Sequence, residues 1–170
     1  MPDARLTLVL GGARSGKSRH AEGLVAASPA PWRYIATGQA FDDEMRARIA
    51  EHRARRGPGW QTEEAPIDLA AALDATPDGC PVLVDCLTLW LSNLMLAGHD
   101  CDAAGLRLAE SLARPRGPWV VVSNEVGLGI VPENALARRF RDAAGWLNQR
   151  AAAAADAVVL MVAGLPLRVK

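Results

Sequence analysis

Hydrophobic residues fall in short unbroken runs along the chain, and longer stretches of mixed polarity separate these runs. Runs with almost no polar residue inside them are typical of strands that are covered on both faces of a sheet. They predict strands at 6–10, 34–37, 81–85, 119–123 and 158–162. The stretches between them predict helices near 17–27, 67–75, 87–97, 102–113 and 134–155. Strands that alternate with helices predict an α/β fold, with a mostly parallel sheet flanked by helices.

One more helix is predicted between the second and third of these strands. It opens on Asp42-Asp43-Glu44, whose acidic side chains suit a first turn, and it ends at Gly57-Pro58-Gly59. Met45, Ile49 and His52 lie at positions i, i+4 and i+7, so they share one face of this helix.

The composition excludes several classes of protein. The chain has 170 residues, 50% of them hydrophobic, which predicts a single domain over 1–170 with its own core. Its 19 basic residues balance 19 acidic ones, which argues against a protein that mainly binds nucleic acid. Neither a membrane span nor a secretory signal is expected from the apolar runs or the first residues. Cys80, Cys86 and Cys101 lack the spacing of a disulfide framework, which favours a cytoplasmic protein.

A glycine-rich segment follows the first predicted strand and precedes the first predicted helix. It fits the pattern G-x-x-x-x-G-K-[ST], in which backbone N–H groups and a helix N-terminus surround a phosphate. Lys17 is expected to reach the β- and γ-phosphates, and it is an unusual residue because Lys170 is the only other lysine here. The segment consists of Gly11, Gly12, Ala13, Arg14, Ser15, Gly16, Lys17 and Ser18. This motif strongly predicts nucleotide binding.

Asp85 ends the apolar strand predicted at 81–85. In a nucleotide-binding protein of this type, an acid at such a position joins the hydroxyl of the loop's serine, here Ser18, in binding Mg²⁺. The alternative is that Asp85 caps the helix that follows it. The phosphate-loop motif favours the metal role.

His52 is surrounded by basic residues. Taken alone, the periodicity favours a hydrogen-bonded histidine at the edge of the core. A histidine among arginines would, however, keep a neutral and nucleophilic imidazole beside groups that bind phosphate. The arginines could also form a solvated face that pairs with Glu44 and Glu51. They are Arg46, Arg48, Arg53, Arg55 and Arg56.

Two further features could belong to a ligand site. The segment 123–127, Ser-Asn-Glu-Val-Gly, follows a predicted strand, at the edge where α/β sheets bind ligands. Simple turn formation is the alternative explanation for it. Trp60 is predicted to lie in a loop, and it is the tryptophan most expected to contact a ligand.

Several of these segments together resemble the bifunctional adenosylcobinamide kinase/adenosylcobinamide-phosphate guanylyltransferase family of cobalamin biosynthesis. The resemblance runs along essentially the whole chain. The phosphate loop is shared with many unrelated enzymes, whereas the segment from Asp42 to His52 and the loop from Asn124 to Pro132 are far more specific. Other matching segments are 34–37, 84–88, 139–142, Gly145 and 148–149.

The resemblance implies a P-loop NTPase fold of the recombinase type and two successive reactions. In the first, the hydroxyl of adenosylcobinamide is phosphorylated with ATP or GTP, with Mg²⁺. In the second, GMP passes from GTP to that phosphate through a guanylylated histidine, giving adenosylcobinamide-GDP. Carried onto this sequence, that histidine is His52, which reverses the preference for a structural role. The family also implies a homotrimer.

The resemblance also implies nucleotide contacts outside the phosphate loop. They fall on Thr37, Gly38, Gln39, Arg53, Arg56, Glu64 and Asp85.

Two other functions remain open on the residues alone. One is a small-molecule kinase, which needs Lys17 and Asp85 but no nucleophilic His52. The other is a nucleotide-binding regulator without turnover.

Overall fold

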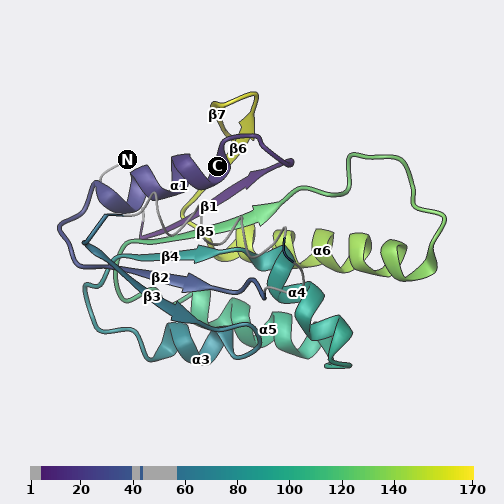
Figure 1. Cartoon of the computed structure of the whole chain (residues 1–170), viewed down its shortest axis with the longest axis horizontal. Coiled ribbons are helices and arrows are strands. Elements are labelled where there is room, and N and C mark those ends of the chain that lie inside the picture. The colour runs from purple at the N-terminus through teal and green to yellow at the C-terminus, as the bar shows by residue number, and fades with distance from the viewer. Residues whose placement is uncertain (1–4, 40–42, 44–56) are drawn as a thin grey trace.

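The computed structural model describes residues 5–39, 43 and 57–170, and these residues form a seven-stranded sheet with helices on both faces (Figure 1). The strand order is β3-β2-β4-β5-β1-β6-β7. Neighbouring strands from β3 to β6 are parallel, and β7 is antiparallel to β6. The strands are β1 Leu6–Gly11, β2 Trp32–Ala36, β3 Trp60–Glu64, β4 Val82–Asp85, β5 Trp119–Asn124, β6 Ala157–Val162 and β7 Leu165–Arg168.

The strands predicted from the apolar runs are confirmed, with ends that differ by one or two residues. β3 and β7, which form the two edges of the sheet, were not predicted. The prediction that Trp60 lies in a loop is wrong, because Trp60 is the first residue of β3. β3 reads Trp-Gln-Thr-Glu-Glu and all of its residues keep some exposure, so it lacks the apolar run that marks a covered strand.

The predicted helices are also confirmed wherever the structure describes the chain. The helix predicted from Asp42 to the glycine-proline segment at 57–59 lies outside the described residues, apart from Asp43. The helices are α1 Lys17–Ala26, α3 Leu69–Asp74, α4 Leu87–Leu96, α5 Cys101–Leu112 and α6 Ala135–Ala154. Asp100 and Asn134 cap the N-termini of α5 and α6 with their side-chain oxygens.

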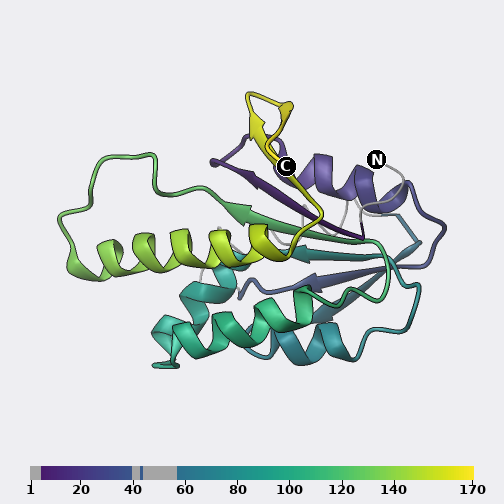
Figure 2. The same ribbon diagram turned by 180° about the vertical axis from the view of Figure 1, so that it is seen from behind.

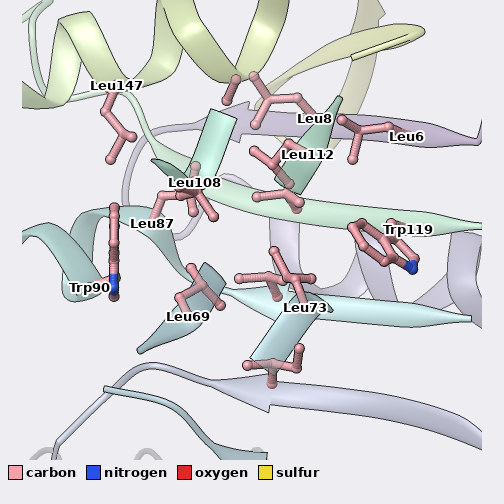
Figure 3. Close-up of a cluster of buried hydrophobic side chains, with 14 of the residues drawn as sticks. Leu6, Leu8, Leu69, Leu73, Leu87, Trp90, Leu108, Leu112, Trp119 and Leu147 are labelled. Carbon is pink, nitrogen blue, oxygen red and sulfur yellow. The ribbon is translucent and has the colours of Figure 1, made fainter. Parts of the chain in front are cut away.

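The helices divide between the two faces of the sheet (Figures 1 and 2). α3, α5 and α6 cover one face, where leucines and two tryptophans form the larger core cluster, drawn in Figure 3. α1 covers the other face, where Ala21 and Val25 pack against valines of β1, β5 and β6. Both faces of the central strands are therefore buried, as their unbroken apolar runs predict. Along the described segments no helix is both long enough and apolar enough to cross a membrane.

The parallel register brings the carboxyl ends of the central strands to one edge. Gly11 at the end of β1 is level with Asn124 at the end of β5. Ala36 at the end of β2 is level with both Asp85 of β4 and Glu64 of β3. Ligands of open α/β sheets bind at this carboxyl edge.

Candidate active site

The predicted phosphate loop joins β1 to α1 at the carboxyl edge of the sheet. β1 ends at Gly11, and α1 begins at Lys17 with Gly16 as its N-cap. Gly16 has φ of 92° and Arg14 has φ of 56°, so the backbone turns twice through the left-handed region within three residues. Gly16 suits such a conformation because it lacks a Cβ. The loop thus places a helix N-terminus and successive backbone N–H groups around one point, the arrangement that binds phosphate.

Lys17 lies over this loop. Its Nζ donates to the Gly12 carbonyl oxygen at 3.2 Å, so the ammonium group is held beside the loop backbone. Ser18 follows in the first turn of α1 and is half-exposed. The structure therefore brings together the lysine and the hydroxyl that the motif requires.

Asp85 lies at the same edge, on β4. The Tyr34 hydroxyl donates to Asp85 Oδ2 at 2.8 Å, which fixes the orientation of the carboxylate from the neighbouring strand β2. Asp85 does not hold the N-cap position of α4, which belongs to Cys86 and has no side-chain cap bond. The capping alternative for Asp85 is therefore wrong.

Ser18 and Asp85 offer a hydroxyl and a carboxylate, which are hard oxygen donors of the kind that Mg²⁺ prefers. Within the described segments, no cluster of three or more His, Cys, Asp or Glu side chains could hold a metal by itself. Mg²⁺ at phosphoryl-transfer sites typically uses one or two protein ligands together with substrate phosphates and water. The two donors fit such a site.

The resemblance predicts a nucleotide contact for Thr37. In the structure its hydroxyl and its carbonyl form hydrogen bonds with other residues of the protein. Thr37 is fully buried, and its hydroxyl donates to the Cys86 carbonyl at 2.7 Å while accepting from the Cys86 N–H at 2.8 Å. Its own carbonyl accepts from Asn93 Nδ2 at 2.7 Å. Thr37 therefore holds the end of β2 against the start of α4.

A buried polar network continues from this point toward the phosphate loop, and sequence reasoning missed most of it. Asn124 Nδ2 donates to the Thr88 hydroxyl at 2.7 Å, and Asn148 Nδ2 donates to the Asn124 carbonyl at 3.2 Å. One feature of the sequence could have indicated this network: an amide on an otherwise apolar helix face, such as Asn93 among the leucines of α4. Buried amides of this kind need hydrogen-bond partners.

Cys86 lies inside this network. Its side chain is buried, and loss of hydration, followed by the nearby charge of Asp85, raises the pKa of the thiol to about 11. The thiol is therefore neutral near pH 7, which excludes it as a nucleophile in the resting site.

The segment 123–127 contacts the phosphate loop through its backbone. The Glu125 N–H donates to the Gly11 carbonyl at 3.1 Å. Glu125 Oε1 accepts from the Gly127 N–H at 2.7 Å, so this carboxylate closes a local turn. The turn explanation is thus correct for Glu125, while Asn124 belongs to the buried network.

Of the remaining predicted site residues, three lie at the carboxyl edge and three lie outside the part of the chain that the structure describes. Gly38 and Gln39 follow Thr37 at the carboxyl edge, half-buried and exposed respectively. Glu64 ends β3 at the same edge and is exposed. His52, Arg53 and Arg56 lie outside the described residues.

Trp60 is not at this edge. It starts β3 at the opposite, amino end of the strand, where its ring lies 5.3 Å from that of Trp32 and 6.2 Å from that of Tyr34. Trp60 therefore lies away from the phosphate loop, and its ring belongs to an aromatic packing cluster. Its contact with a ligand stays a prediction.

Comparison with known proteins identifies relatives along the whole chain. Residues 7–169 match the family model described as cobinamide kinase / cobinamide phosphate guanyltransferase. The bifunctional adenosylcobalamin biosynthesis protein CobP of Pseudomonas aeruginosa is 52% identical over 166 residues, covering 96% of each chain. The bifunctional adenosylcobalamin biosynthesis protein CobU of Salmonella typhimurium is 44% identical over 182 residues, covering 97% of this chain and 99% of its own. CobU of Escherichia coli is 43% identical with the same coverage.

Solved structures resemble the chain in fold alone. A protein from Pyrococcus horikoshii superposes with a TM-score of 0.57 at 8% identity, covering 98% of this chain and 86% of that one. An ATPase from a bacterial type III secretion system gives a TM-score of 0.54 at 11% identity, covering 92% of this chain and 50% of that one. These likenesses support the predicted fold class, an α/β fold with a mostly parallel sheet flanked by helices.

Proposed function

This chain belongs to the cobinamide kinase / cobinamide phosphate guanyltransferase family, and we propose that it performs both reactions at the carboxyl edge of its sheet. In the first reaction it phosphorylates the hydroxyl of adenosylcobinamide with ATP or GTP. In the second it transfers GMP from GTP to that phosphate, giving adenosylcobinamide-GDP. The observation that carries the proposal is the complete phosphate loop between β1 and α1, with Lys17 folded over it and Asp85 beside it on β4.

In the kinase reaction, the loop and α1 hold the triphosphate. Backbone N–H groups of the loop donate hydrogen bonds to the phosphate oxygens, and the Lys17 ammonium offsets the charge that builds up on these oxygens as the γ-phosphoryl group leaves. The substrate hydroxyl forms the new P–O bond and loses its proton, and the nucleoside diphosphate departs. Positioning and charge stabilisation account for most of the rate in this type of reaction.

Ser18 and Asp85 would hold Mg²⁺, which when bound neutralises phosphate charge. The Tyr34 hydroxyl orients the Asp85 carboxylate for that role. Ser18 lies in the first turn of α1 and Asp85 at the end of the central strand β4, so both donors are on rigid elements.

The guanylyltransferase reaction requires a nucleophile, and we assign it to His52. A neutral imidazole nitrogen attacks the α-phosphorus of GTP, the bond to the β-phosphate oxygen breaks, and pyrophosphate leaves. The phosphate of the phosphorylated cobinamide then attacks the phosphoramidate, which restores free His52. Arg53 and Arg56 follow in the sequence and are suited to pair with phosphate oxygens.

The intact mass of the protein after incubation with GTP and Mg²⁺ tests this assignment. One guanylyl group should add to the unaltered chain and to His99→Ala, a control that removes an exposed histidine beyond α4. His52→Ala should gain no adduct and should lose guanylyl transfer while it retains phosphorylation. The adduct should survive alkali and be lost in acid, as a phosphoramidate is.

An adduct that persists in His52→Ala would overturn the assignment to His52. Phosphorylation without any adduct in the unaltered chain would instead identify a kinase without guanylyltransferase activity.

We further propose that the protein is a cytoplasmic homotrimer. Large apolar side chains gather on two exposed segments, the β5–α6 loop with Leu128 and Ile130, and β7 with Leu165 and Leu167. Ile130 is 97% exposed in the single chain, and a second copy of the chain could cover such large exposed apolar side chains. Light scattering on the eluting protein should give three times the mass of the chain.

A further inference from the structure

The turn between β6 and β7 lies directly against the phosphate loop (Figures 1 and 2). The Gly164 N–H donates to the Ser15 carbonyl oxygen at 3.0 Å. A Cβ added to Gly16 would lie 3.3 Å from Gly164 Cα, so the two backbones touch. At the base of the loop, a Cβ on Gly11 would lie 3.0 Å from the Met161 carbonyl oxygen and would also collide with the Ser15 hydroxyl. The hairpin and the loop are therefore packed backbone against backbone.

The bond from Gly164 fixes the direction of one particular peptide group. The carbonyl of Ser15 and the N–H of Gly16 belong to the same planar trans peptide, so they point in opposite directions. Because the hairpin holds the Ser15 carbonyl on its own side, the Gly16 N–H is turned away from the hairpin. Gly16 is also the N-cap of α1, so its N–H belongs to the concave side of the loop, where the phosphate binds.

The backbone of the turn itself is unusual. Ala163 has φ of 51° and Gly164 has φ of 83°, which is the pair of left-handed residues that a two-residue hairpin of type I′ requires. Alanine has no local reason to adopt this conformation, and asparagine or glycine is the usual residue at such a site. The turn nevertheless keeps the geometry that brings the Gly164 N–H to Ser15.

We propose that the β6–β7 turn is a positioning element for the nucleotide, in which the Gly164 N–H holds the Ser15–Gly16 peptide so that the Gly16 N–H faces the phosphate. Gly164 acts through the loop and does not itself touch the ligand. The inference rests on the proposed function only in requiring that the loop bind a nucleoside triphosphate. The proposal also gives β7 a role in nucleotide binding, because β7 pairs with β6 and thereby forms the hairpin that holds the turn.

Substitutions that differ only in their tolerance of a left-handed backbone test the proposal. Gly164→Val places a branched side chain at a positive φ, where it is strongly disfavoured, and the added Cβ meets open space, so the turn must change conformation. Gly79→Val is the matched control, because Gly79 has φ of 78°, also faces open space, and lies before β4 at the amino edge of the sheet. Gly164→Asn keeps the backbone N–H in a residue that tolerates the left-handed region.

The measurements are the Kd for GTP by calorimetry and the midpoint of thermal unfolding. The two valine variants should lose similar thermal stability, whereas only Gly164→Val should bind GTP about tenfold or more weakly, the value of one hydrogen bond to a charged group. Gly164→Asn should recover most of the affinity. Equal Kd values for Gly164→Val and the unaltered chain, or an equal loss in Gly79→Val, would overturn the proposal while leaving the proposed function intact. Absence of GTP binding by the unaltered chain would overturn both.

Discussion

Asp85 accepts a hydrogen bond from the buried Tyr34 hydroxyl while its carboxylate remains half-exposed at the site. Asp85→Asn removes the negative charge but keeps an oxygen that Tyr34 can bond, so the fold should be preserved. Turnover should fall roughly a hundredfold, the usual cost of losing one charge interaction in a phosphoryl-transfer site. The Mg²⁺ concentration for half-maximal activity should rise.

Tyr34→Phe is the comparison for this experiment, because it removes the hydroxyl and keeps the carboxylate. A smaller loss of turnover is expected for it than for Asp85→Asn. Unchanged activity of Asp85→Asn at limiting Mg²⁺ would contradict the metal role.

The buried thiol of Cys86 gives a second test at the residue scale. With its pKa at about 11, about one molecule in a thousand carries a thiolate at pH 8, and burial also blocks access. Iodoacetamide at pH 8 should therefore label Cys80 and Cys101, which are partly exposed, while Cys86 stays unmodified until denaturant is added. Peptide mapping by mass spectrometry measures all three sites. Labelling of Cys86 as fast as Cys80 in the native protein would contradict its burial.

Residues whose role follows from a local motif could be predicted from the sequence, and those whose role follows from distant contacts could not. Lys17 and Ser18 were identified because a strand, a glycine loop and a helix follow one another in the chain. Thr37 lies at the expected edge, but only the structure shows that its hydroxyl is bonded to Cys86, the N-cap of α4. The hydrogen bond between Gly164 and Ser15 joins residues far apart in the sequence, so no local motif predicts it.

At the scale of elements, α6 shows how a distant residue completes a helix. Lys170 Nζ donates to the carbonyls of Ala152 at 3.1 Å and Ala155 at 2.5 Å, which closes the C-terminal end of this helix. A cation at this end also interacts favourably with the helix dipole. Lys170→Met keeps most of the aliphatic chain but removes the charge, and it should lower the free energy of unfolding by about 0.5–1 kcal/mol.

Urea unfolding monitored by circular dichroism measures this loss of stability. Lys170→Arg is the control and should retain most of the stability, because the guanidinium also donates to carbonyl oxygens. An unchanged unfolding midpoint for Lys170→Met would show that water replaces the cap without cost.

The elements that the sequence did not predict are the two edge strands. An edge strand packs little of its surface, so it does not need the apolar run that identified the central strands. β7 contains Pro166 and is exposed along its whole length, and proline is tolerated there because one side of an edge strand has no ladder to form. Its place is determined by pairing with β6 and by the turn at Ala163 and Gly164, which are features of the assembled sheet.

At the scale of the whole molecule, the phosphate loop connects the two halves of the core. β1 lies between β5 and β6 in the sheet and contributes to both core clusters, and α1 covers the face opposite α5 and α6. The loop between β1 and α1 also contacts the β6–β7 turn and the backbone that follows β5. A nucleotide bound there is therefore held by a junction that exists only in the folded state.

A ligand that binds only the folded state raises the free energy of unfolding with the logarithm of its concentration once that concentration exceeds the Kd. GTP with Mg²⁺ at about a hundred times its Kd should add about 2.7 kcal/mol to the free energy of unfolding. For a chain of this size, that corresponds to an increase of about 5–10 °C in the unfolding midpoint, measured by scanning calorimetry. Lys17→Ala should unfold at a similar temperature without ligand but should lose most of this increase at the same GTP concentration, because its Kd is raised. An equal increase in the unaltered chain and in Lys17→Ala would show that GTP stabilises the protein from a site other than the phosphate loop.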